Sequence, residues 1–186
     1  MESDLKILIE QCKQNKRTAQ TEIYNLFSAK LFSVCLRYSD NYEDAQDTFQ
    51  DGFIIAFHKI SQFQFKGSFE GWLKRIMINT CIEKHRKKNY LFVVDEELTK
   101  EETTEEFDEE LETTAYSYEE LLELIKELPP RYRQVFNLYV FEEYPHQKIA
   151  EMLGISEGTS KSNLSRAREK LMESINKKSK EKIATK

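Results

Sequence analysis

The sequence predicts an all-α protein with two small helical domains joined by an acidic flexible linker, the second domain containing a helix-turn-helix. Apolar residues recur at the helical period of about 3.6 residues, and no alternating β pattern stands out. Five Gly and three Pro are few for 186 residues, which also favours helices. Residues 89–116 break the pattern, because they are acidic and threonine-rich and lack a clear apolar face.

The net charge of −5 is unusual for a DNA-binding protein, but the charge is unevenly distributed. Residues 95–112 contain eleven acidic residues and one lysine, so this segment carries −10 and the rest of the chain +5. A basic remainder is compatible with a nucleic-acid partner.

The cysteines Cys12, Cys35 and Cys81 are widely spaced on apolar helical faces, which indicates reduced core residues of a cytoplasmic protein. Cys81 and His85 have the spacing of half a zinc site. No second pair completes it, so we expect neither a metal nor a cofactor. The sequence contains no signal peptide and no apolar run near the length of a membrane span, so we expect no membrane insertion.

The N-terminal domain, residues 1–88, is expected to begin with a short amphipathic helix that ends near Lys13. A second helix carries its apolar stripe on Ile23, Leu26, Phe27, Leu31, Val34 and Tyr38. Asn41 can cap a third helix, from Tyr42 to about Ile60. Its core face is formed by Ala45, Phe49, Phe53, Ala56 and Ile60.

The third helix has a second coherent face, formed by Asp44, Asp47, Asp51, Ile55 and His58. Most acidic faces are merely solvated, but Ile55 is an apolar residue that the core does not need. A metal-dependent nuclease would require further carboxylates or histidines, because one helix cannot enclose an ion. A partner-binding face is therefore the better interpretation.

An aromatic loop, residues 61–69, follows with Gly67 as its hinge, and Ser68 can cap the next helix, which runs to about Lys88. The apolar face of this helix is formed by Phe69, Trp72, Leu73, Ile76, Met77 and Thr80. Arg75, Asn79 and Arg86 align on another face. Aromatic rings beside a basic stripe suit single-stranded DNA, because bases need stacking surfaces and phosphates need positive charge. The alternative is that Phe63, Phe65 and Trp72 simply complete a core.

The C-terminal domain, residues 117–176, begins with a capping box from Ser117 to Glu120, which opens a helix. Pro129 ends that helix, and Pro130 suits the first position of the next one. The apolar face of this next helix is formed by Tyr132, Val135, Phe136 and Tyr139. The lysine-rich tail, residues 177–186, is expected to fray.

The segment from His146 to Leu171 has the pattern of a helix-turn-helix. Gly154 permits the positive φ of a tight turn, and Ser156 can cap the second helix. The polar residues Lys161, Ser162, Ser165, Arg166 and Arg168 remain outside, where they can donate hydrogen bonds to a DNA major groove. An αα-hairpin that merely packs is the alternative, but the cap, the turn glycine and the arginines together favour DNA.

These segments, in this order, resemble the extracytoplasmic-function (ECF, group IV) sigma factors of bacterial RNA polymerase across nearly the whole chain. The run from Asp44 to Phe53 resembles the polymerase-binding helix of the family, and Phe69 through Asn79 resembles its promoter-opening helix. The run from Leu128 to Phe136, with Ile149, Ala150 and residues 158–162, resembles its second domain.

The resemblance implies a sigma factor that binds core polymerase and promoter DNA and has no catalytic centre of its own. Its polymerase-binding residues would be Asp44, Asp47, Asp51 and Ile55. Its contacts to the minus-ten element would be Phe63, Phe65, Lys66, Arg75, Asn79 and Arg86. Its contacts to the minus-thirty-five element would be Thr159, Lys161, Ser162, Ser165, Arg166 and Arg168. Family members are often held inactive by an anti-sigma factor, which makes such a partner an open expectation.

Two positions depart from the family pattern. Lys148 stands where a glutamate is usual. Ser160 stands where an apolar residue is usual, and for this reason we expect weaker packing of the recognition helix. A second class of function stays open, a stand-alone helix-turn-helix regulator with an N-terminal sensing or dimerisation domain. Such a regulator should bind its duplex site tightly without polymerase, usually as a dimer.

Overall fold

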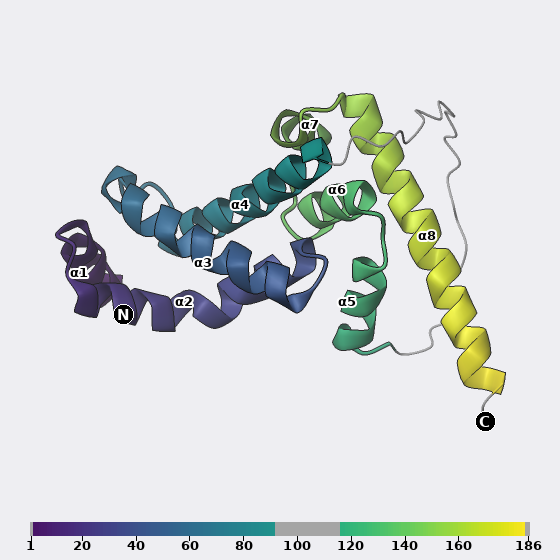
Figure 1. The fold of residues 1–186 in the computed structure, drawn as a ribbon, viewed down its shortest axis with the longest axis horizontal. Helices are drawn as coiled ribbons and strands as arrows, with labels where there is room; N and C mark the ends of the chain where they lie inside the picture. Colours follow the sequence, from purple (N-terminus) through teal and green to yellow (C-terminus); the bar gives the residue numbers. More distant parts are fainter. Residues whose placement is uncertain (1, 92–115, 185–186) are drawn as a thin grey trace. The chain divides into compact units, whose positions relative to one another are not determined.

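The computed structural model describes residues 2–91 and 116–184, and within these ranges it contains helices and no strand. The chain divides into two compact units, the first of which ends at Val93. Helices α1 to α4 belong to the first unit and α5 to α8 to the second (Figure 1). An all-α protein with two helical domains is thus confirmed. Most of the expected linker lies outside the described residues.

Between residues 2 and 91, the first unit contains four α-helices and one short 3-10 helix. They are α1 (Glu2–Lys13), α2 (Arg17–Tyr38), α3 (Tyr42–Lys59), η1 (Ile60–Gln62) and α4 (Phe69–Leu91). The predicted caps are present, since Asn41 Oδ1 accepts a hydrogen bond from the Asp44 amide at 2.7 Å and Ser68 Oγ one from the Gly71 amide at 2.9 Å. Helices α2, α3 and α4 pack on one another, and α1 packs on α2.

The predicted apolar stripes of this unit need two corrections. Leu26 of α2 is 61% exposed, whereas Ala19 and Cys35 are buried. On α4 the buried face is wider than predicted and includes Ile78, Cys81, Ile82 and His85. Both α2 and α3 cover α4, so this helix buries more than one stripe. The predicted core face of α3 is confirmed.

At Gly52 helix α3 packs closely against a side chain of α4. A Cβ atom at this position would overlap the sulfur of Met77, a side chain that is itself fully buried. The absence of a side chain at residue 52 therefore lets the two helices pack at this distance.

The second unit consists of α5 (Tyr118–Lys126), α6 (Pro130–Val140), α7 (His146–Leu153) and α8 (Glu157–Ala184). The capping box is confirmed, with hydrogen bonds between Ser117 and Glu120 in both directions, and α6 begins at Pro130 as predicted. The predicted apolar face of α6 is partly wrong, because Tyr139 is exposed while Asn137 and Leu138 are buried. Arg133, also buried, donates a hydrogen bond to the carbonyl oxygen of Lys126 at the end of α5.

The expectation that the chain frays from Lys177 is wrong up to residue 184, because α8 continues to Ala184. Tyr116 and Glu127 hold this part of α8. The Tyr116 hydroxyl lies 2.7 Å from Ser179 Oγ and donates to the carbonyl oxygen of Ile175 at 2.9 Å, and Lys178 Nζ lies 3.2 Å from Glu127 Oε1. Across the parts of the chain that the structure describes, no helix has the length and apolar character needed to cross a membrane.

Candidate functional sites

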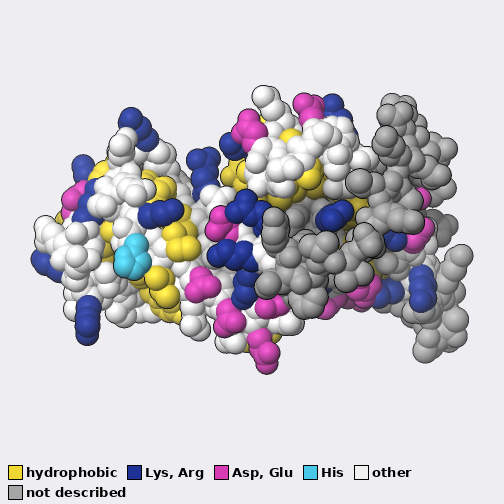
Figure 2. Space-filling model, turned by 45° about the horizontal axis from the view of Figure 1, so that its top comes forward, with side chains coloured by type: hydrophobic (Ala, Val, Ile, Leu, Met, Phe, Trp, Pro, Cys, Tyr) yellow, Lys and Arg dark blue, Asp and Glu magenta, His cyan; other side chains and the backbone are white. Residues whose placement is uncertain are grey.

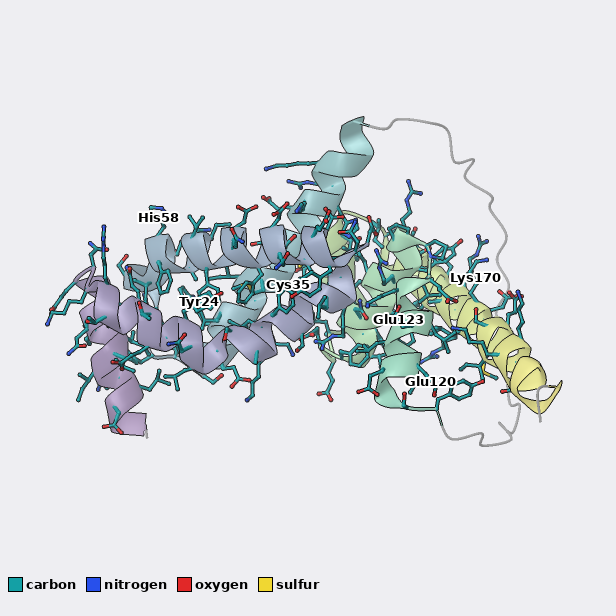
Figure 3. The ribbon with its side chains drawn as sticks, turned by 60° about the horizontal axis from the view of Figure 1, so that its bottom comes forward. Tyr24, Cys35, His58, Glu120, Glu123 and Lys170 are labelled. Carbon is teal, nitrogen blue, oxygen red and sulfur yellow. The ribbon has the colours of Figure 1, made fainter. Side chains whose placement is uncertain are left out.

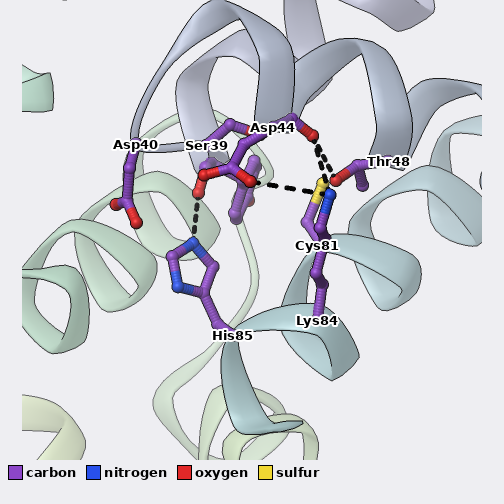
Figure 4. A pocket seen from close by; sticks show the side chains of 8 residues that line it. Ser39, Asp40, Asp44, Thr48, Cys81, Lys84 and His85 are labelled. Atoms are coloured by element: carbon purple, nitrogen blue, oxygen red, sulfur yellow. Dashed lines mark hydrogen bonds and ion pairs between the residues drawn. The ribbon is translucent and has the colours of Figure 1, made fainter. Parts of the chain in front are cut away.

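The acidic face of α3 is partly neutralised by a lysine from α4. Lys84 Nζ lies 3.7 Å from a carboxylate oxygen of Asp44 and donates to the main-chain oxygen of Asp44 (Figure 4). It also lies 3.7 Å from a carboxylate oxygen of Asp47. Asp44 is half-buried by this arrangement, whereas Asp47 and Asp51 are exposed. The two outer carboxylates are thus the ones that a partner can reach.

Ile54 is an exposed apolar residue on this face that the sequence analysis missed. Its side chain is 56% exposed, whereas Ile55, the predicted residue, is half-buried. Ile54 follows Asp51 by three residues and precedes His58 by four, so the helical period could have placed it there. His58 stands on the outward side of α3, away from Tyr24 (Figure 3). Hydrophobic side chains also reach the surface of the first unit (left in Figure 2).

The aromatic loop divides into one supporting ring and one presented ring. Phe63 is 5% exposed, and its ring lies 5.1 Å from Phe69 and 5.5 Å from Trp72, measured between centroids. Phe65 lies 5.0 Å from Phe63 but is 38% exposed. Gly67 has φ +89, so the loop uses the conformational freedom predicted for it. Of the two predicted loop aromatics, Phe65 is the exposed one and Phe63 the buried one.

The basic stripe of α4 contains an acid that the sequence analysis missed. Arg75, Asn79 and Arg86 are exposed, as are Lys66 of the loop and Glu83. Glu83 follows Asn79 by four residues and therefore shares the stripe. Its carboxylate pairs with the Arg86 guanidinium at 3.3 Å. This pair is exposed at both ends and orients the arginine only weakly.

The helix-turn-helix has the predicted turn and cap. Gly154 has φ +68, and the Thr159 amide donates to Ser156 Oγ at 3.0 Å. Ile149, Leu164 and Ala167 are buried between the helices. These local interactions set the outward face of the first turns of α8.

The predicted DNA contacts in the first turns of α8 differ in their exposure. Thr159, Lys161 and Ser162 are exposed, and Lys161 forms an ion pair with Glu157 at 2.8 Å. Ser165 and Arg166 are half-buried. The Arg166 guanidinium donates to the Tyr132 hydroxyl of α6 at 3.5 Å.

Arg168 of α8 lies beside Tyr139 of α6. It is exposed, and its guanidinium carbon lies 5.9 Å from the centroid of the Tyr139 ring, so the two predicted arginines lie on different sides of α8. Glu169, four residues after Ser165, adds an exposed acid to the outward face that the sequence analysis did not consider.

Ser160 is fully buried, and its hydroxyl lies 2.9 Å from His146 Nδ1. The His146 ring stacks on Tyr139 with centroids 4.7 Å apart. Burial lowers the pKa of His146, and the charge of Lys161 lowers it further. The polar residue at 160 therefore has a partner that the sequence pattern did not indicate.

Cys81 and His85, which have the spacing of half a zinc site, each contact another residue of the first unit. His85 is buried, and its Nε2 lies 2.6 Å from the main-chain oxygen of Tyr38. A hydrogen bond with Cys35, together with burial, raises the pKa of the Cys81 thiol. Burial also raises the pKa of Cys12 to about 11. In the two described ranges, no group of three or more His, Cys, Asp or Glu side chains is arranged to hold a metal ion.

Two family models match the chain. Sigma-70 region 2 matches residues 23–90, which include the α3 face and the α4 stripe, and Sigma-70, region 4 matches residues 118–171, which include the helix-turn-helix. The ECF RNA polymerase sigma factor SigW of Bacillus subtilis is 29% identical over 184 residues, covering 94% of this chain and 98% of the relative. The chain belongs to the ECF sigma factors of RNA polymerase.

Other comparisons agree with this assignment. The RNA polymerase sigma factor SigV of Bacillus subtilis is 29% identical over 136 residues, covering 73% of this sigma factor and 78% of the relative. The sigma factor RpoE from Bartonella quintana, solved in complex with the anti-sigma factor NepR, has the same fold. Its TM-score is 0.54 at 20% identity, over 84% of this chain and 96% of that one. The alternative of a stand-alone regulator is not favoured.

Proposed function

We propose that this sigma factor docks on core polymerase through the outward face of α3, with Asp47 and Asp51 around the exposed Ile54. Exposed carboxylates beside an apolar side chain fit a basic, partly apolar surface. The half-buried Asp44 and Ile55 support this face from its edge. The observation that carries this assignment is the 56% exposure of Ile54 on a helix whose core face is already complete.

The loop after η1 and the outer stripe of α4 hold the non-template strand of the minus-ten element. Phe65 offers a stacking surface, Phe63 supports it from the core, and Lys66 adds a positive charge next to it. The stripe continues along α4 through Arg75, Asn79 and Arg86. A stripe of this kind stabilises opened DNA, because it binds single-stranded phosphates and an unstacked base together.

The N-terminal half of α8 reads the minus-thirty-five element. Ser162, Ser165 and Arg166 share a broad outward face, with Lys161 at one edge and Thr159 at the other. Short serine side chains allow close approach to the groove, and arginine can contact guanine with two hydrogen bonds. Arg168 contacts phosphate from the side of the helix.

Each of the two predicted domains has its own role in initiation. Residues 1–88 bind polymerase and open the minus-ten element, residues 117–176 read the upstream element, and residues 89–116 connect them. The protein acts in the cytoplasm without catalysing a reaction itself. An anti-sigma factor is a further candidate partner.

Run-off transcription with bacterial core polymerase, with and without this chain, tests the proposal. Specific transcripts should require the chain. If the chain instead binds a duplex site tightly alone and produces no transcript with polymerase, the regulator hypothesis is correct.

Replacing Asn79 with alanine tests the opening step separately. Permanganate reactivity of promoter thymines should fall while polymerase binding stays unchanged. Asn25→Ala, the same change at an exposed position of α2, is the matched control. Equal reactivity of the Asn79→Ala variant and the wild type would show that the stripe is only solvated.

A further inference from the structure

Phe65 is held in an unusual conformation for an exposed residue. Its φ is +59, in the left-handed region that residues with a side chain seldom occupy. Such a conformation persists only where the surroundings hold it, and it often marks a binding surface. One contact is the buried Phe63 ring. The other contacts come from α1.

Two lysines of α1 lie over the exposed ring. Lys13 Nζ is 4.6 Å and Lys6 Nζ 5.5 Å from the ring centroid of Phe65. Because they are seven residues apart, two helical turns bring both to the same face of α1. Glu10 lies between them and forms an ion pair with Lys13 at 3.0 Å.

This arrangement differs from an ordinary tether between a loop and a helix. One ammonium group over the ring would be enough to hold Phe65, and an apolar side chain would hold it better. Two ammonium groups instead concentrate positive charge beside a surface on which a base can stack. A phosphate is a full anion, so it attracts an ammonium group more strongly than the face of a ring does.

We propose that Lys6 and Lys13 form, together with Phe65, a binding site for single-stranded DNA in which a base stacks on the ring and the two lysines bind the flanking phosphates. The inference rests on the proposed function, because it extends the strand-binding surface from α4 and its loop to α1. When the strand binds, the base replaces the ammonium groups on the ring. Glu10 competes with the phosphate for Lys13.

The test uses the full chain bound to core polymerase and a short fluorescein-labelled oligothymidylate, with affinity measured by anisotropy at several salt concentrations. Lys6→Ala and Lys13→Ala should each weaken binding and lower the slope of log affinity against log salt by about 0.7, the value for one phosphate contact on a single strand. Core polymerase is common to all samples, so its own salt dependence cancels between variants. Lys16→Ala, an exposed lysine in the turn after α1, is the matched control and should change neither quantity.

Two further variants separate this site from a mechanical tether. Lys13→Arg keeps the charge and should restore both affinity and slope. Glu10→Gln removes the competing acid and should raise the affinity, whereas loss of a tether contact would lower it or leave it unchanged.

Weaker binding with an unchanged salt slope, or a Glu10→Gln variant that binds no better than the wild type, would overturn the proposal. The proposal would also be overturned if the oligothymidylate bound the wild-type complex no more tightly than core polymerase alone. In each of these cases the wild type would still support run-off transcription, whereas a wrong proposed function would mean no specific transcript.

Discussion

Ser160 Oγ and His146 Nδ1 lie 2.9 Å apart where α7 meets α8, and the serine is completely buried. A serine at a usually apolar position would be a defect if its hydroxyl had no partner in the interior. Here the histidine supplies that partner, and the Tyr139 ring covers the histidine. The packing of the recognition helix thus includes a polar contact instead of a purely apolar one.

Replacing Ser160 with alanine should destabilise the second unit by about 1–3 kcal/mol, because it leaves a half-buried histidine nitrogen without its partner. Urea unfolding followed by circular dichroism reports both units, while the fluorescence of the single tryptophan, Trp72, reports the first unit. The dichroism transition should shift and the fluorescence transition should not. Ser162→Ala, at an exposed position on the same helix, is the control.

The lowered pKa of His146 predicts a pH dependence of the second unit. Because burial lowers the pKa in the folded state below its ordinary value of 6.5, the unfolded chain binds more protons near and below that value. Stability should therefore be complete above that pH and fall as the pH drops through it. Urea midpoints measured from pH 7.5 to 5.5 test this, with His146→Gln as the reference. An equally steep loss in the variant would contradict the assignment to His146.

Replacing Ile54 with glutamate should abolish pull-down of core polymerase while leaving the helical content unchanged. An extra carboxylate would remove the apolar contact at the centre of the proposed docking face. Leu26→Glu is a matched control, because Leu26 is an equally large apolar side chain, 61% exposed, on another helix of the same unit. Asp47→Arg combined with Ile55→Glu should also abolish the pull-down. Equal loss with Leu26→Glu would mean that the effect is not specific to the α3 face.

The two arginines of α8 should have different effects on promoter choice. Arg166→Ala should relax the preference at one or two upstream positions, at a cost in discrimination of about 1–3 kcal/mol. Arg168→Ala should weaken all promoters about equally and reduce the salt dependence. Selection from promoters with a randomised upstream element measures both. If Arg166→Ala selects the wild-type sequence, another face of α8 lies in the groove.

The contact between α3 and α4 predicts that Gly52→Ala destabilises the first unit by about 1–3 kcal/mol through overpacking against Met77. The double variant Gly52→Ala with Met77→Ala should lose less than the sum of the two single variants, since the smaller side chain makes room. Unfolding followed by Trp72 fluorescence measures both. Gly158→Ala of the second unit, followed by circular dichroism, is the control, because a Cβ there would meet Ser156 Oγ at an ordinary 3.7 Å. Additive losses would show that the two sites are not in contact.

The helices, their caps and the turn of the helix-turn-helix could be predicted from the amino-acid sequence. The Asn41 cap, the Ser117–Glu120 capping box and the positive φ of Gly154 depend on residues a few positions apart, so they are legible in the sequence. The family also followed from the sequence, because its motifs lie on these local elements in a fixed order.

The exposed parts of each helix, and the contacts between side chains far apart in the sequence, became known from the packing of the helices. Leu26 and Ile54 are large apolar residues of the kind that fill cores, but among the described residues their side chains are exposed. Ser160 and His146 are 14 residues apart in the sequence, and Phe65 meets lysines of a helix that ends more than 50 residues earlier. Helical periodicity predicts the direction in which each side chain points around the axis of its own helix. Whether that side chain is buried, and which group a polar side chain contacts, depends on where the other helices pack.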